Sequence, residues 1–205
     1  MLRHACSTMA LVAFLTAPCW AQSAAPTAMI AVNMQTTDLL VTDMKYRVLF
    51  NKREQKAIPL TDFDFAANLQ DELHSTLAND KRFQWRPAKA AEKDALAPLF
   101  APATMKAKSL PAPAVEADRV LLVSPSYVAF IHAMRKFIQV GVALRLVDRR
   151  TGRVLWKKTL SERTGLPDTL EDMQADNQKV LKETLNKVMD QITPKVRAYV
   201  VASKM

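Results

Sequence analysis

Hydrophobic and polar residues alternate over long stretches in the second half of the chain. Between residues 136 and 147 every second position is apolar: Ile138, Val140, Val142, Leu144 and Leu146. A period of two predicts a strand with one buried face. The sequence Asp148-Arg149-Arg150-Thr151-Gly152 is typical of a hairpin turn in which Gly152 takes a positive φ, and residues 153–160 predict the return strand. A further buried strand is predicted at 119–123, extended or followed by 127–133.

The first half of the chain predicts shorter elements. Residues 44–50 alternate as a half-buried strand, and polar residues 51–56 follow as a turn. Thr61 and Asp64 have capping-box spacing, and apolar residues then recur at helical intervals to about Asn79. Residues 82–86 predict a short strand that buries Phe83 and Trp85, and residues 89–100 predict a short helix.

A proline-containing loop and a long helix complete the pattern. Pro102, Pro111 and Pro113 predict that residues 101–117 form a loop or extended linker. Asp168 and Glu171 form a second capping box. Pro194 should kink or end the helix that follows, with residues 195–201 continuing as a further turn or two. The apolar stripe of that helix is Leu170, Met173, Asn177, Val180, Leu181, Thr184, Leu185, Val188 and Ile192.

These elements predict an α/β (α+β) fold in a single domain, residues 44–201. We expect a mixed, mainly antiparallel sheet of about four or five strands, with the first helix and the long C-terminal helix on one face. Those helices need an apolar surface, and the alternating face of residues 138–146 supplies it. Residues 22–43 begin rich in Ala, Thr and Ser, and are interpreted as a mobile leader.

The first 21 residues have the pattern of a secretory signal peptide. Arg3 and His4 precede an uncharged run from Ala5 to Ala17, and small residues occupy the two recognition positions, Cys19 and Ala21. That run is too short for a bilayer, which needs roughly 20 residues. We therefore expect cleavage after Ala21 and a periplasmic location; an uncut interfacial anchor is the alternative. No further run of about 20 apolar residues exists, so no transmembrane segment is expected in the mature chain.

Cleavage after Ala21 would also remove both cysteines, Cys6 and Cys19, so the mature chain would have no disulfide and no thiolate. Charge is a second constraint: the 29 Lys and Arg against 20 Asp and Glu give a net charge of +9. In an exported protein this excess fits either an anionic envelope surface or ordinary solubility, and not nucleic acid. The expected partner is such a surface or an envelope protein.

The positive charge is concentrated in the last hairpin. Its basic residues are Arg145, Arg149, Arg150, Arg153, Lys157 and Lys158. One interpretation is an anion-facing tip on a turn held out from the core; the other is a solvated ribbon whose charges discourage edge pairing. The candidate partner-binding residues are Arg149, Arg150, Arg153, Lys157 and Lys158.

No constellation predicts catalysis, a cofactor or a metal. The chain has only 3 Gly, which excludes the Gly-rich phosphate loops. His74 and His132 fall in different elements, and Ser124 and Ser126 have no Gly-x-Ser-x-Gly context. The carboxylates Asp62, Asp64, Asp168, Glu171 and Asp172 lie in first helical turns, where capping explains them. Trp85 and Trp156 are predicted to be core residues.

Two segments resemble a known group of envelope domains. Ala117-Asp118-Arg119-Val120-Leu121-Leu122-Val123 is similar to an "ADxVLxG" strand, and residues 140–156 are similar to a "VxLRLVDxxTGxVLW" hairpin. Both resemble the periplasmic α/β domain shared by the curli-secretion channel protein, the outer-membrane activators of penicillin-binding proteins and the N-terminal domain of the Tol translocation protein. Ser124 stands where that group has Gly, and no lipidation Cys begins the mature chain.

The resemblance implies a non-enzymatic role, since members of this group are chiefly binding and assembly modules. We therefore expect a periplasmic binding or adaptor protein that acts in envelope assembly or secretion. An envelope-polymer hydrolase is the alternative. The sequence leaves the partner and the oligomeric state open.

Overall fold

The computed structural model describes residues 25–34, 37–47, 50–132, 135–166 and 176–203. The expected signal peptide and the capping box at Asp168 lie outside these ranges. The strands are β1 (Thr27–Val32), β2 (Leu39–Arg47), β3 (Phe50–Ile58), β4 (Gln84–Pro87), β5 (Arg119–His132), β6 (Arg135–Asp148) and β7 (Val154–Gly165). The α-helices are α1 (Phe65–Leu77), α2 (Ala90–Leu96) and α4 (Lys179–Ala202), with 3-10 turns at Ala97–Phe100, Pro102–Thr104 and Asp176–Gln178.

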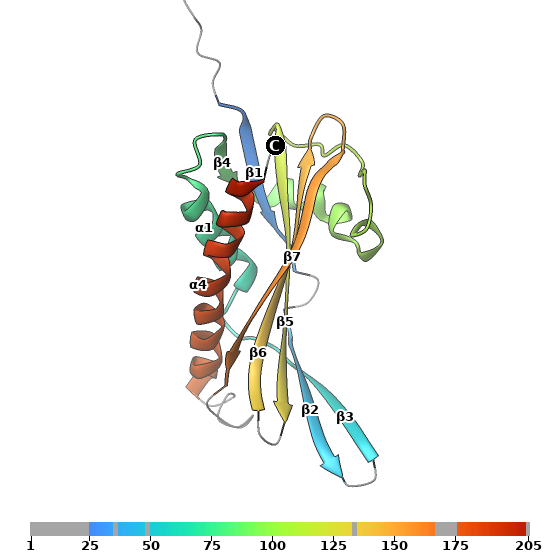
Figure 1. The fold of residues 1–205 in the computed structure, drawn as a ribbon, viewed down its shortest axis with the longest axis vertical. Coiled ribbons are helices and arrows are strands. Elements are labelled where there is room, and N and C mark those ends of the chain that lie inside the picture. The colour runs from blue at the N-terminus through green and yellow to red at the C-terminus, as the bar shows by residue number, and fades with distance from the viewer. Residues whose placement is uncertain (1–24, 35–36, 48–49, 133–134, 167–175, 204–205) are drawn as a thin grey trace, which may run out of the picture.

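The strands form one mixed, seven-stranded sheet built around the long strand β5 (Figure 1). One edge of β5 pairs with β6, which pairs with β7, both antiparallel. The other edge is shared: β1 lies parallel to its first half, with β4 beyond, and β2 lies parallel to its second half, with β3 beyond. Any cross-section of the sheet therefore contains about five strands.

Pro125 occupies the middle of β5, a position that a central strand normally excludes. The main chain of Val123 faces β1, because its carbonyl accepts from the Asn33 N–H at 3.0 Å. The main chain of Pro125 faces the same edge, because it lies two residues further along the strand. The pairing of β5 with β1 ends at Val123, however, and its pairing with β2 begins only at Val128. Its missing N–H therefore falls in the gap between the two partner strands.

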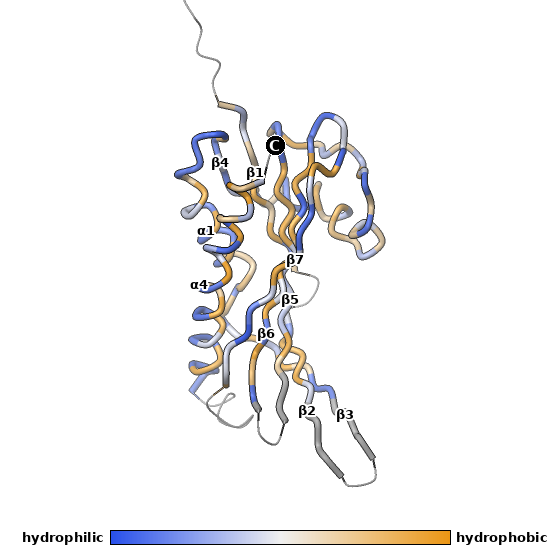
Figure 2. The backbone as a smooth tube through the Cα atoms, in the orientation of Figure 1, coloured by the Kyte–Doolittle hydropathy of each residue, from blue (hydrophilic) through white to orange (hydrophobic). Residues whose placement is uncertain are grey.

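Helices α1 and α4 cover one face of the sheet, as expected (Figure 1). The alternating residues of β6 lie beneath them and are at most 1% exposed: Ile138, Val140, Val142, Leu144 and Leu146. The apolar side of α4 faces the sheet, and its hydrophilic residues face outward (Figure 2). This arrangement confirms the predicted fold class and the role of the β6 face.

The opposite face is covered over only part of its length. A second apolar cluster joins Met29, Ala31, Val120, Leu122 and Val147 of the sheet to α2 and the chain that follows it. Leu110, Val115 and Ala117 of the proline-containing loop belong to this cluster and are buried. The loop is therefore a cover of the sheet rather than a free linker.

Two expectations for the N-terminal part were wrong. The interpretation of residues 22–43 as a mobile leader fails because β1 lies inside the sheet and β2 begins at Leu39. The turn expected at 51–56 belongs instead to the polar edge strand β3. These extra strands raise the count from the expected four or five to seven.

The helix boundaries also differ from the prediction. The N-cap of α1 is Asp64, whose Oδ1 accepts from the Ala67 N–H at 2.9 Å, so Thr61 and Asp64 do not form a capping box. Pro194 lies inside α4 and does not end it; the expected continuation over residues 195–201 is confirmed, with Val196 and Val200 buried. Within the described part of the chain, no helix is both long and apolar enough to cross a membrane.

Candidate functional site

The hairpin turn between β6 and β7 is held by its own acidic residue. Asp148 Oδ1 accepts from the Thr151 N–H at 2.9 Å and from the Thr151 hydroxyl at 2.8 Å, while Oδ2 pairs with Arg119 at 2.6 Å. These hydrogen bonds lower the pKa of Asp148. Gly152 takes φ +67°, as the sequence predicts. The D-x-x-T-G motif is thus explained as a turn and needs no ligand.

The tip of this hairpin is not held out from the core, which corrects the expectation. The proline-containing loop pairs with it: the Leu110 N–H donates to Gly152 O at 2.8 Å and the Val154 N–H donates to Lys108 O at 3.0 Å. A β-bridge joins Ser109 to Arg153 between these bonds. Two segments about 40 residues apart in the sequence therefore form one surface.

This pairing gathers six exposed cations, which we call the basic surface: Lys106, Lys108, Arg149, Arg150, Arg153 and Lys157. None of them forms an ion pair with any residue that the structure describes. Their charges therefore contribute no pairing energy to the fold, and their mutual repulsion slightly opposes it. Of the predicted binding residues, the structure brings Arg149, Arg150, Arg153 and Lys157 together here.

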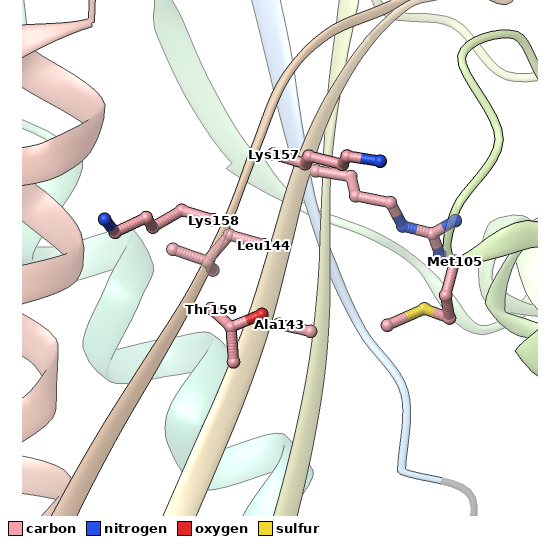
Figure 3. Close-up of a pocket in the computed structure, with 7 residues that line it drawn as sticks. Met105, Ala143, Leu144, Lys157, Lys158 and Thr159 are labelled. Carbon is pink, nitrogen blue, oxygen red and sulfur yellow. The ribbon is translucent and has the colours of Figure 1, made fainter.

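Lys158, the fifth predicted binding residue, belongs to the other side of the sheet. Its ammonium lies over the ring of Tyr199 on α4, 5.1 Å from the centroid. Figure 3 shows Lys157 and Lys158 extending in opposite directions from neighbouring positions of β7. Strand alternation explains this difference.

A groove of about 430 Å³ lies beside the basic surface, between β6, β7 and the chain at Met105 (Figure 3). Its lining comprises Met105, Ala143, Leu144, Arg145, Lys157, Lys158 and Thr159. The strand register explains the grouping, because Arg145 pairs with Lys157 and Ala143 pairs with Thr159. The groove therefore combines cations and a hydroxyl with a few apolar atoms.

Arg145 is the most unusual residue of the groove, because it is a buried cation, only 2% exposed. One terminal nitrogen donates to Leu99 O at 2.6 Å, and the other donates to Thr104 O at 3.0 Å and to its hydroxyl at 3.3 Å. Burial lowers the pKa of Arg145, and no described carboxylate opposes that effect. The guanidinium thus fixes residues 99–104 to the sheet while leaving a positive charge beneath the groove.

The other candidate residues show no catalytic arrangement. His74 Nε2 lies 3.2 Å from Trp85 O, and the side chain of His132 lies outside the described residues. Trp85 is buried and Trp156 packs against the same core cluster, as predicted. Among the residues that the structure describes, no three His, Cys, Asp or Glu side chains could hold a metal ion together. The geometry of the groove and the basic surface is suited to binding anions.

Comparison with solved structures finds the following similarities. Protein XCC0632 from Xanthomonas campestris, of family DUF330, has a TM-score of 0.53 at 9% identity, over 90% of this chain and 88% of that chain. The hypothetical protein CT253 from Chlamydia trachomatis has a TM-score of 0.49 at 17% identity, over 86% of this chain and 98% of that chain. Lipoprotein GNA1162 from Neisseria meningitidis has a TM-score of 0.42 at 15% identity, over 84% of this chain and 99% of that chain.

The likeness to XCC0632 shows a shared fold. At 9% identity it shows nothing about function. No family model matches the sequence, and no curated protein does.

Sequence reasoning identified the cations of the hairpin but missed the groove. Strand alternation places Arg145 on the face away from α1 and α4, and its side chain contacts residues 99–104 there. The burial of Arg145 depends on residues 99–104, more than 40 positions away in the sequence, and a local sequence pattern cannot predict such a contact. Met105 and Thr159 carried no signal at all.

Proposed function

We propose that this chain is an exported, non-enzymatic binding or adaptor protein of the bacterial cell envelope, acting in envelope assembly or secretion. The observation that carries the proposal is the basic surface. Six exposed cations from two distant segments lie together without ion pairs to described residues. A surface of this kind is suited to an anionic partner, because complementary charge speeds encounter and selects the partner.

The signal-peptide pattern of residues 1–21 supports the envelope as the compartment. The resemblance of residues 117–123 and 140–156 to envelope assembly domains supports an adaptor role. The partner is then an envelope protein with an acidic patch, or the anionic envelope surface itself.

Affinity capture from crosslinked envelopes tests this function. The wild-type chain should recover one stoichiometric partner, and Arg149→Ala combined with Arg150→Ala should reduce the recovered amount. Lys187→Ala combined with Arg197→Ala is the matched control, since it removes the same charge from exposed positions of α4 on the other face of the sheet.

Equal recovery with both double variants would remove the basic surface from the proposal. Turnover of an envelope polymer by the purified chain, lost on changing a single polar residue, would replace the adaptor function with a hydrolase.

A further inference from the structure

Two buried polar atoms without partners lie on the side of the sheet opposite α1 and α4. The described residues contain four such side-chain atoms, two of which are Arg145 Nε and Ser124 Oγ. Ser124 pairs with Ala143, and Ala143 precedes Arg145 by two positions on the same face of β6. A buried donor without an acceptor costs about 1–3 kcal/mol, so the unpartnered Nε leaves the positive charge of Arg145 incompletely compensated next to the groove.

The polar side chains that line the groove are three cations and one hydroxyl, without a carboxylate among them. Lys157 lies across from Arg145, and its ammonium donates to Lys106 O at 3.3 Å, at the edge of the groove. Thr159 lies across from Ala143 and adds a hydroxyl. No described carboxylate neutralises Arg145, so the complementary ligand is an oxyanion.

The arrangement of the donors distinguishes between oxyanions. Both terminal nitrogens of Arg145 already bind the carbonyl oxygens of Leu99 and Thr104, so the end-on fork that matches a planar carboxylate is occupied. The donors that remain open to the groove are the exposed side chains of Lys157 and Thr159, two single groups on one face of β7. Such a set suits the tetrahedral oxygens of a phosphate, and lysine is a common phosphate ligand as a point charge.

We propose that the groove binds a phosphate group, with Lys157 and Thr159 as donors above the buried positive charge of Arg145. The volume of about 430 Å³ lies in the range of small-molecule sites, and Met105 and Ala143 leave apolar room for a short organic substituent. This inference rests on the proposed function, because it names the chemistry that the binding protein recognises beside its basic surface.

Titration calorimetry of the mature chain tests the site with glycerol 3-phosphate, inorganic phosphate and acetate. Glycerol 3-phosphate should bind saturably with one site per chain, and acetate at the same concentration should not. Lys157→Met should weaken binding by at least about fivefold, since it removes one charged donor. Lys187→Met is the matched control, because Lys187 is an exposed residue of α4 on the other face of the sheet and does not line the groove; it should stay within about twofold.

The variants at Lys157 and Lys187 avoid the folding risk of changing Arg145, which is buried. Tighter binding of glycerol 3-phosphate than of inorganic phosphate would assign an organic phosphate, such as a head group, and equal binding would assign free phosphate. Absence of saturable phosphate binding, equal losses in the two Lys variants, or equally tight acetate binding would overturn the inference. If a partner is still captured through Arg149 and Arg150 in that case, the proposed function stands without the groove.

Discussion

Replacing Gly152 by alanine should break the junction between the hairpin and the proline-containing loop. Gly152 takes φ +67°, which costs an L-residue roughly 1–2 kcal/mol. A Cβ at this position would lie 1.9 Å from Leu110 O, so the loop backbone must move. That movement stretches the Leu110 N–H to Gly152 O bond of 2.8 Å, which contributes about 1 kcal/mol. It also exposes part of the buried Leu110 side chain.

We expect Gly152→Ala to lower the free energy of unfolding by about 2–4 kcal/mol, measured by urea denaturation. Gly165→Ala is the matched control, because the nearest atom to its added Cβ is Lys136 O at 3.9 Å, an ordinary contact. Its unfolding free energy should change by less than about 0.5 kcal/mol. A loss below about 0.5 kcal/mol for Gly152→Ala would refute the close pairing of loop and hairpin.

Three further predictions concern stability. Leu144→Asp should unfold the domain, because an unpaired charge at a site that is 1% exposed costs several kcal/mol. The measurement is loss of the cooperative thermal transition, and a folded variant would contradict the packing of α4 on β6. The Arg86 fork lowers the pKa of Glu92 from 4.5 to about 2, so Glu92 contributes stability above pH 4.5 that is lost as the pH falls toward 2. Glu92→Gln should therefore be less stable than wild type at pH 7 in urea titrations, with the difference shrinking toward pH 2; a constant difference would contradict this ion pair. Arg82 donates to Val200 O at 2.9 Å and so caps the end of α4. Arg82→Ala should lower the free energy of unfolding by about 1–2 kcal/mol and speed hydrogen exchange in the last turn of α4. Unchanged exchange there would contradict this capping role.

The hairpin of β6 and β7 could be predicted in detail because its signals are local. Alternation predicts which residues of β6 face α1 and α4. The D-x-x-T-G sequence predicts the turn and the positive φ of Gly152. The helix stripes likewise report one-sided burial. In such elements the periodicity of the sequence itself shows which side is buried in the folded protein.

The strands β1 and β3 could not be recognised in the same way. β1 is buried on both faces between β4 and β5, so its apolar run shows no period of two, and its small residues resemble a leader. β3 is an edge strand whose residues 51–56 are polar, so it resembles a turn. In both strands the position in the sheet determines the composition, and that position is set by distant segments.

The groove depends on the same kind of distant contact. The sequence placed Arg145 on the correct face of β6, but only the docking of residues 99–104 buries it. The basic surface needs the bridge between Ser109 and Arg153, which joins a loop and a hairpin that local patterns treat separately.

The central claim is that the basic surface binds an anionic envelope partner, and the salt dependence of partner binding tests it most directly. Once the captured partner is purified, its affinity should be measured from low to high ionic strength for the wild-type chain and for Arg149→Ala with Arg150→Ala. We predict weaker binding by the double variant at low salt, a flatter salt dependence, and an unchanged melting temperature, because exposed charges contribute little to stability. Equal affinities for wild type and variant at low salt would contradict the claim and leave these arginines as a solvated turn.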